Sequence, residues 1–113
     1  MNMKIVTAVI RPFKLDEICE VLAGLGIGGL TVLEVRGFGG RGHPESYSTD
    51  VPAATLVPRV KLEMAVPDEL VDDVMEAIIS TAQTGRLGDG KIFVTDLEQA
   101  VRIRNRESGN DAL

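Results

Sequence analysis

The segment Val57–Ala82, with the sequence VPRVKLEMAVPDELVDDVMEAIISTA, decides the fold predicted for this chain. Residues 57–66 are rich in apolar side chains and predict a strand, which Pro67 ends because proline has no N–H to donate to a neighbouring strand. Pro67, Asp68 and Glu69 are typical of the first turn of a helix. Helical spacing then places the apolar residues on one face, namely Leu70, Val71, Val74, Ile78 and Ala82. The segment therefore predicts a strand followed by an amphipathic helix.

The N-terminal part of the chain predicts the same order of elements. Residues 3–10 are apolar and β-branched, which predicts a largely buried strand that Pro12 ends. Residues 15–25 predict a helix whose apolar face carries Leu15, Ile18, Cys19, Leu22 and Leu25. A second strand is expected over residues 30–38.

The rest of the chain completes the predicted fold. A glycine-rich turn at residues 83–90 leads into a strand at residues 91–95, and a last short strand is expected near residues 101–104. We expect the polar C-terminal tail, residues 105–113, to be disordered. The order β-α-β-loop-β-α-β is that of the α+β ferredoxin-like fold, in which two helices cover one face of an antiparallel sheet. We therefore predict one ferredoxin-like domain over residues 1–104.

The composition narrows the class of protein. The chain has 113 residues, which fits one compact domain, and 44% of them are hydrophobic, enough for a core without metal or disulfide staples. The formal net charge of −5 argues against nucleic-acid binding, which depends on Lys and Arg. Against this acidic background the basic residues Lys91, Arg102, Arg104 and Arg106 cluster near the C-terminus, which suits a small polyanion better than a long one.

The number of cysteines and the hydropathy of the chain indicate the cellular compartment in which the protein is expected. Cys19 is the only cysteine, so the chain has no intrachain disulfide and no cysteine-rich zinc site, and its helical spacing predicts a buried structural thiol. The N-terminus runs directly into a predicted strand, so no signal peptide is recognised, and no apolar run approaches the ~20 residues of a membrane span. We therefore expect a cytoplasmic protein.

Two glycine-rich motifs match nucleotide-binding fingerprints only formally. Gly37, Gly39 and Gly42 fit G-x-G-x-x-G, but no helical period follows, and that fingerprint must open a helix. Residues 85–91, GRLGDGK, fit G-x-x-x-x-G-K, but Ile92 stands where a P-loop has Ser or Thr, and it begins a strand. We reject both the Rossmann and the P-loop interpretations.

The chemistry of this second motif still suits an anion. Small residues let backbone N–H groups converge on an anion, and Lys91 adds a mobile cation beside them. A tight turn alone explains Gly88, Asp89 and Gly90 about as well as phosphate binding does. The turn by itself therefore leaves both interpretations open.

Two arginines form a second basic group. Arg102 and Arg104 flank Ile103, and the period of a strand puts both guanidinium groups on one face, with Val101 and Ile103 toward the core. Like charges on one face repel unless an anion lies between them, and arginine forks match phosphate oxygens two at a time. Solvated arginines, or arginines paired with Asp or Glu, would also explain the spacing. The turn and the arginines together favour a phosphate chain.

These motifs together resemble the PII nitrogen-regulatory family. The stretch TGRLGDGKIFV at residues 84–94, followed by VRIR at residues 101–104, closely resembles the family signature. The segments IRPFKL at residues 10–15, RGFG at residues 36–39 and PRVKLE at residues 58–63 match as well, so the resemblance covers nearly the whole chain. It implies a homotrimer of ferredoxin-like subunits that acts in signalling and is not an enzyme.

The resemblance also implies nucleotide sites in the clefts between subunits. The family binds ATP and ADP competitively, as regulatory ligands rather than obligatory cofactors; we add AMP as a further ligand and leave Mg²⁺ open. Carried over by position, the residues near the adenine are Thr31, Glu63 and Ala65, and those that wall the cleft are Gly37, Phe38 and Gly39. The phosphates would be held by Gly88, Asp89, Gly90 and Lys91, with Arg102 and Arg104 from the neighbouring subunit.

The segment at about residues 39–54 corresponds to the family's T-loop, which docks onto targets such as membrane transporters and metabolic enzymes. Pro52 stands where many members carry the tyrosine that is uridylylated, so we predict no uridylylation at that site. Arg59 replaces the family's lysine for 2-oxoglutarate, and Gly40-Arg41-Gly42 replaces a glutamine that helps to hold it. We therefore assign Arg59 and Arg41 to a small effector anion, either 2-oxoglutarate or bicarbonate, and predict weak 2-oxoglutarate binding.

An alternative of another class is a small ferredoxin-like enzyme, such as an acylphosphatase. An enzyme needs an activated nucleophile or an acid–base pair, and the sequence offers neither a Ser/Cys–His arrangement nor a metal cluster. A copper carrier would show closely spaced Cys or Met-Cys ligands, which are absent. The sequence therefore favours a binding protein.

Overall fold

The computed structural model describes residues 2–38 and 56–113, so the predicted T-loop, with Gly39, Arg41 and Pro52, lies outside the described residues. The strands are β1 (Met3–Ile10), β2 (Thr31–Gly37), β3 (Val57–Pro67) and β4 (Gly90–Leu97). The helices are α1 (Leu15–Gly24) and α2 (Val71–Ala82), and the short 3₁₀ turns are η1 (Pro12–Lys14), η4 (Asp68–Leu70) and η5 (Gly109–Ala112).

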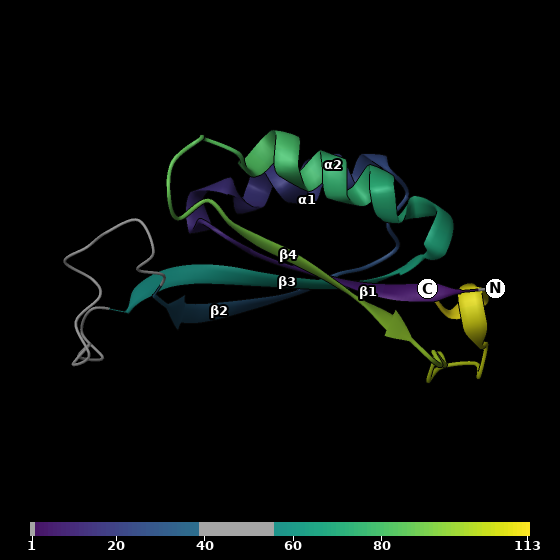
Figure 1. The fold of residues 1–113 in the computed structure, drawn as a ribbon. Coiled ribbons are helices and arrows are strands. Elements are labelled where there is room, and N and C mark those ends of the chain that lie inside the picture. The colour runs from purple at the N-terminus through teal and green to yellow at the C-terminus, as the bar shows by residue number, and fades with distance from the viewer. Residues whose placement is uncertain (1, 39–55) are drawn as a thin grey trace.

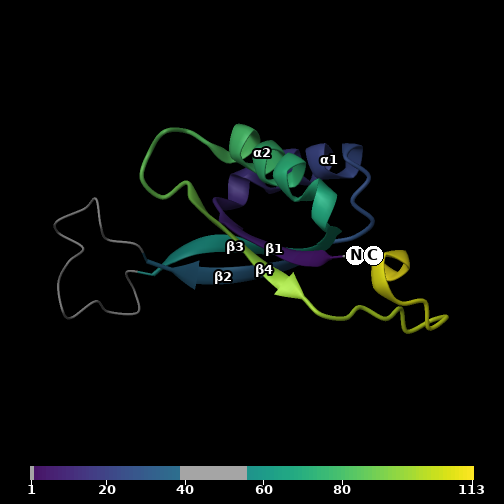
Figure 2. The same ribbon diagram turned by 45° about the vertical axis from the view of Figure 1, so that its right-hand side comes forward.

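The four strands form one antiparallel sheet in the order β2-β3-β1-β4. Both helices lie side by side on the same face of this sheet, as Figures 1 and 2 show from two directions. The order of elements and the placement of the helices confirm the predicted ferredoxin-like fold. Each predicted strand through residue 95 is present, with its bounds shifted by no more than two residues.

The core lies between the sheet and the helices. Side chains alternate across a strand, and the even-numbered residues of β3 from Val60 to Val66 are buried against the helices. Ala8 of β1 lies between Leu62 on β3 and Ile92 on β4 in the register of the sheet. The helices contribute the fully buried side chains Ile18, Leu22, Val74 and Ile78. Burying one such side chain stabilises the fold by roughly 1.5–3 kcal/mol.

The opposite face of the sheet has no helix over it in the described part of the chain. One row of directly paired residues crosses this face from β2 to β4: Thr31, Glu63, Thr7 and Phe93. Two large apolar side chains on the outer strands remain accessible, since Leu33 is 41% exposed and Phe93 is 53% exposed. An accessible apolar sheet face of this kind is typical of an interface with another chain.

The prediction of a strand near residues 101–104 is wrong. Val101 makes a single bridge to Ser108, and the chain between them folds back in a turn closed by the Arg102 N–H on the Glu107 carbonyl at 2.7 Å. Ile103 does not face the core; it is 97% exposed. The chain reverses here instead of continuing as a strand because Arg106 adopts φ 64°, in the left-handed region.

The tail departs from its expected disorder, because residues 109–112 form η5, whose end is tied by the Leu113 N–H to the Asn110 carbonyl. Cys19 is half-buried rather than buried. Its neighbour Ile18 faces the sheet, and a helix turns by 100° per residue, which moves Cys19 to the margin of the buried stripe. Among residues 2–38 and 56–113, no helix is long and apolar enough to cross a membrane.

Candidate anion-binding site

The turn between α2 and β4 lies at the end of the sheet where β1 finishes (Figure 1). Gly85, Gly88 and Gly90 adopt φ values of 83°, 94° and 110°, which side-chain-bearing residues rarely reach. A Cβ added to Gly90 would lie 1.8 Å from the carbonyl oxygen of Val9, an impossible contact. Gly90 is therefore required by the close approach of β4 to β1, whatever the turn binds.

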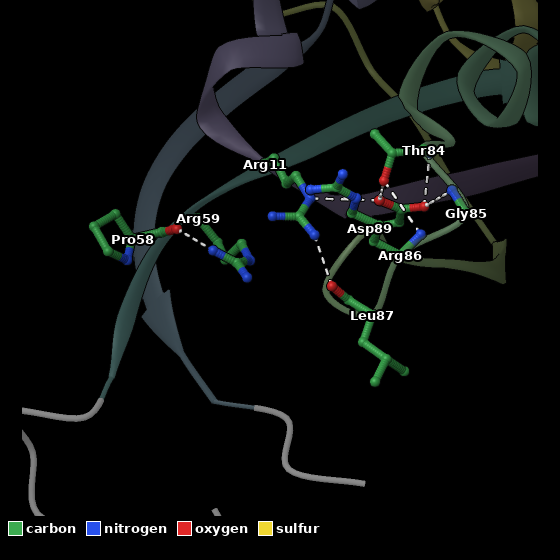
Figure 3. Close-up of polar contacts among 8 residues, drawn as sticks. All are labelled: Arg11, Pro58, Arg59, Thr84, Gly85, Arg86, Leu87 and Asp89. Atoms are coloured by element: carbon green, nitrogen blue, oxygen red, sulfur yellow. Dashed lines mark hydrogen bonds and ion pairs between the residues drawn. The ribbon is translucent and has the colours of Figure 1, made fainter. Parts of the chain in front are cut away.

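The carboxylate of Asp89 holds the beginning of the turn (Figure 3). Its Oδ2 accepts hydrogen bonds from the backbone N–H of Thr84 at 2.8 Å and of Gly85 at 2.9 Å. Its Oδ1 accepts a hydrogen bond from the Thr84 hydroxyl. These bonds, led by that of the Thr84 hydroxyl and joined by an ion pair from Arg11, lower the pKa of Asp89 to about 2. The side chain of Asp89 thus faces into the turn.

Two arginines lie beside Gly88. Arg11 Nη2 donates to the Leu87 carbonyl at 2.6 Å, and Arg11 Nε lies 3.4 Å from Asp89 Oδ1. Arg59 Nη1 donates to the Pro58 carbonyl at 2.8 Å. A Cβ added to Gly88 would lie 3.1 Å from Nη2 of both arginines, so the two guanidinium groups converge on this glycine.

Lys91, the residue that follows the turn, carries a positive charge that no described residue pairs. It is exposed and forms no hydrogen bond or ion pair with any described residue. An open pocket of about 390 Å³ lies between α2, β1 and the start of β4, and Asp89, Gly90 and Lys91 are among its lining residues. The rest of its wall is mostly apolar, with Ile79 and Ile92 as examples. The turn therefore combines backbone N–H groups, one unpaired lysine and two nearby arginines, which suits an anion.

The residues assigned to the adenine lie on the uncovered face of the sheet, the face that also carries Lys91 in the register, and those assigned to the cleft wall lie at the end of β2. Thr31 is directly paired with Glu63, and Ala65 follows two residues later on the same face of β3. The Glu63 carboxylate lies 3.6 Å from Lys61 Nζ. Gly37 ends β2, and the next residue, Phe38, is 63% exposed; Gly39 lies outside the described residues.

The structure does not bring Arg102 and Arg104 to the turn of the same chain. They follow β4, whose eight residues span about 23 Å, and Figure 2 shows the C-terminal segment beyond the far end of the sheet. Arg102 Nη2 donates to the Asp111 carbonyl at 3.2 Å, and Arg102 Nη1 lies 3.6 Å from Glu107 Oε1. Arg104 is exposed, with no hydrogen bond or ion pair to a described residue. Within a single subunit, the glycine-rich turn and these two arginines are therefore too far apart to bind the same phosphate groups.

Sequence reasoning missed Arg11 as a residue of the turn. Seventy-eight positions separate Arg11 from Asp89, and only the pairing of β1 with β4 brings them together. The signal available was the position of Arg11 directly after a strand that ends beside the turn. Within the described residues, no group of three or more His, Cys, Asp or Glu side chains could hold a metal ion.

The fold and this turn define a class: an α+β ferredoxin-like protein with a glycine-rich turn, flanked by basic side chains, between its second helix and last strand. The family profile for nitrogen regulatory protein P-II matches residues 3–107. The chain is 54% identical over 112 residues to a nitrogen regulatory protein P-II of Haemophilus influenzae, with 98% of this chain and all of that protein covered. It is 49% identical, with the same coverage, to nitrogen regulatory protein P-II 1 of Escherichia coli K12.

A solved structure agrees. The crystal structure of Arabidopsis thaliana PII bound to citrate superposes with a TM-score of 0.83 at 35% identity, covering 99% of this chain and 92% of that one. The chain belongs to the nitrogen regulatory P-II family of signal-transduction proteins. The resemblance stated from the sequence motifs is thereby confirmed, and the names of the relatives favour a regulatory protein over an acylphosphatase-like enzyme.

Proposed function

We propose that this protein binds ATP, ADP or AMP at three clefts between the subunits of a homotrimer. In this proposal the nucleotide sets the state of the T-loop, and the T-loop regulates a transporter or metabolic enzyme of nitrogen metabolism in the cytoplasm. The nucleotide is a signal and not a substrate, and no obligatory cofactor is needed. Family membership supports the regulatory role, and the geometry of two basic regions supports the shared site.

The observation that carries the proposal is the separation of two basic groups within one chain. Lys91 and the N–H groups of the turn stand at one end of β4, and the free guanidinium of Arg104 lies beyond the other. Both groups are exposed and basic in a chain with a formal net charge of −5. In the proposed trimer, a head-to-tail arrangement would bring the arginines of one chain onto the turn of the next, and three such contacts would close the ring.

Exposed apolar surface supports assembly. Ile103 and Val101 are 97% and 59% exposed beside the arginines, and Phe93 is 53% exposed on the uncovered face of the sheet. A solvated monomer gains nothing from a large aliphatic side chain at that exposure, whereas burial in an interface stabilises each by roughly 1.5–3 kcal/mol. The apolar residues that flank Arg102 and Arg104 would therefore dock the arginines on a second copy.

The decisive experiment is nucleotide titration by calorimetry. Wild-type protein should bind ATP and ADP with micromolar or tighter affinity, and Lys91→Met should weaken both by about 10- to 100-fold, since a charge-assisted hydrogen bond is lost. Lys14→Met, which removes an equal charge from η1, should change affinity by less than about threefold. Absence of nucleotide binding by the folded wild-type protein contradicts the proposal.

A second, smaller anion is proposed at Arg59. Its guanidinium lies beside Gly88 and forms no ion pair with a carboxylate among the described residues. The Arabidopsis thaliana relative, described as bound to citrate, supports carboxylate binding in this family. We expect Arg59, with Arg41, to bind an oxyanion, and 2-oxoglutarate to bind weakly even with Mg-ATP. Titrating 2-oxoglutarate and bicarbonate into the ATP-saturated protein tests this; tight, Mg-ATP-dependent 2-oxoglutarate binding contradicts it.

A further inference from the structure

Asp89 was expected among the residues that hold phosphate, yet its carboxylate is already engaged inside the turn. It accepts the N–H groups of Thr84 and Gly85 and the hydroxyl of Thr84. Backbone N–H groups that converge on one point are an anion-binding arrangement, and here the anion is part of the chain. Those two N–H groups are therefore not available to a ligand.

Simple electrostatics also argues against direct contact between Asp89 and a phosphate. A carboxylate repels a phosphate oxygen, and the lowered pKa of Asp89 keeps it charged at neutral pH. A negative side chain beside a polyanion site costs affinity unless it does something else for the site. The hydrogen bonds that Asp89 accepts indicate its role in the site: they fix the path of the backbone from Thr84 toward Lys91.

Arg11 holds the same turn from outside. It directly follows Ile10, the last residue of β1, which pairs with Gly90 in the register of the sheet. Through two nitrogens it contacts Asp89 and the Leu87 carbonyl, one on either side of Gly88. A guanidinium that spans two points fixes their separation, which a single ammonium group cannot do. The tip of the turn is thus tied to the rigid end of the central strand.

We infer that Asp89 and Arg11 are positioning residues that hold the turn in its binding shape before any ligand arrives, and that the Asp89 side chain never touches the phosphates. This inference rests on the proposed nucleotide site. Binding then needs no ordering of the turn, and the N–H groups from Leu87 onward, with Lys91, are left for the ligand. Pre-ordering of this kind raises affinity because the entropy cost is met during folding.

The experiment uses the full chain with the variant Asp89→Asn, because a positioning role and a charge effect predict opposite signs. Removing a negative charge near a polyanion should strengthen ATP binding if the charge alone matters. If Asp89 positions the turn, binding should weaken by about 10-fold or more, since Asn has one acceptor oxygen and cannot accept both from the two backbone N–H groups and from the Thr84 hydroxyl and Arg11. Asp73→Asn, the same change on the exposed first turn of α2, is the matched control and should leave affinity unchanged.

Arg11 is tested by a pair of variants. Arg11→Met should weaken ATP and ADP binding by the same factor, because the turn is disturbed for both, whereas a direct phosphate contact would change their ratio. Arg11→Lys should restore part of the loss. Hydrogen exchange of the nucleotide-free protein gives an independent readout: the amides of Thr84 and Gly85 should be protected in the wild type and exchange faster in Asp89→Asn.

Each result has one interpretation. Weaker binding by Asp89→Asn, with faster exchange at Thr84 and Gly85 in a variant that still unfolds cooperatively, supports the inference. Unchanged or tighter ATP binding by Asp89→Asn overturns it, while loss of binding in Lys91→Met still upholds the nucleotide site. Wild-type protein that binds no nucleotide overturns the proposed function, and this inference with it.

Discussion

The turn at residues 84–91 and the C-terminal segment at residues 98–108 contribute the two basic groups of the candidate site, yet they are built in opposite ways. The turn is held by hydrogen bonds that its own Asp89 accepts and by Arg11, which directly follows β1. The C-terminal segment closes on itself through one bridge and exposes Ile103 almost completely. The turn is held together within one chain, whereas the C-terminal segment presents apolar side chains that the described residues leave exposed.

Gly90→Ala should produce the largest effect on the turn. The added methyl group would lie 1.8 Å from the Val9 carbonyl oxygen, at φ 110°, so β4 must separate from β1. We expect a loss of at least about 3 kcal/mol in the free energy of unfolding. Gly29→Ala is the control, because its methyl group meets no atom within 4 Å, and it should change stability by less than about 1 kcal/mol. Equal denaturation midpoints for the two variants would contradict the close approach.

The double variant Arg102→Ala with Arg104→Ala tests the C-terminal segment. Two charge-assisted contacts are lost, so ATP binding should weaken by about 2–5 kcal/mol while the fold is retained. Arg106→Ala removes one positive charge from the same segment, half of what the double variant removes, and serves as the comparison. An equal loss in Arg106→Ala, measured by calorimetry, would show that general charge and not a specific contact is responsible.

Ile103→Asp tests the apolar part of the C-terminal segment. We expect wild-type protein to scatter light as a trimer of about 36 kDa, three times 12.1 kDa. Losing one buried isoleucine per interface costs about 1.5–3 kcal/mol. The trimer of the variant should therefore dissociate at a higher protein concentration than the wild-type trimer. An unchanged dissociation midpoint would place Ile103 outside the interface.

Acid titration should give the smallest effect. The pKa of Asp89 is lowered to about 2 in the folded chain, below its ordinary value of 3.8. The stability that its hydrogen bonds contribute is therefore complete above about pH 4 and is lost as the pH falls through about 2. The difference in unfolding free energy between wild type and Asp89→Asn should shrink over this range. A difference that stays constant down to pH 2 contradicts the assigned bonds.

The two regions also show how far the sequence could lead. Periodicity and proline placement predicted the strands and helices through residue 95, because their buried faces are long enough to show a period. The strand near Val101–Arg104 was predicted wrongly, because the alternation of apolar and basic residues there serves an exposed turn. Arg11 was missed because its contact with Asp89 depends on strand register, which local pattern does not encode.

The central claim, that each site is shared by two chains, is tested most directly by mixing two defective variants. Lys91→Met supplies intact arginines and Arg102→Ala with Arg104→Ala supplies an intact turn, and the two are refolded together in equal amounts. In each mixed trimer one of the three sites should pair an intact turn with intact arginines, which is about a quarter of all sites after random mixing, and these sites should bind ATP with wild-type affinity. If mass spectrometry shows mixed trimers but calorimetry finds no such sites, both basic groups act within one chain and the account is wrong.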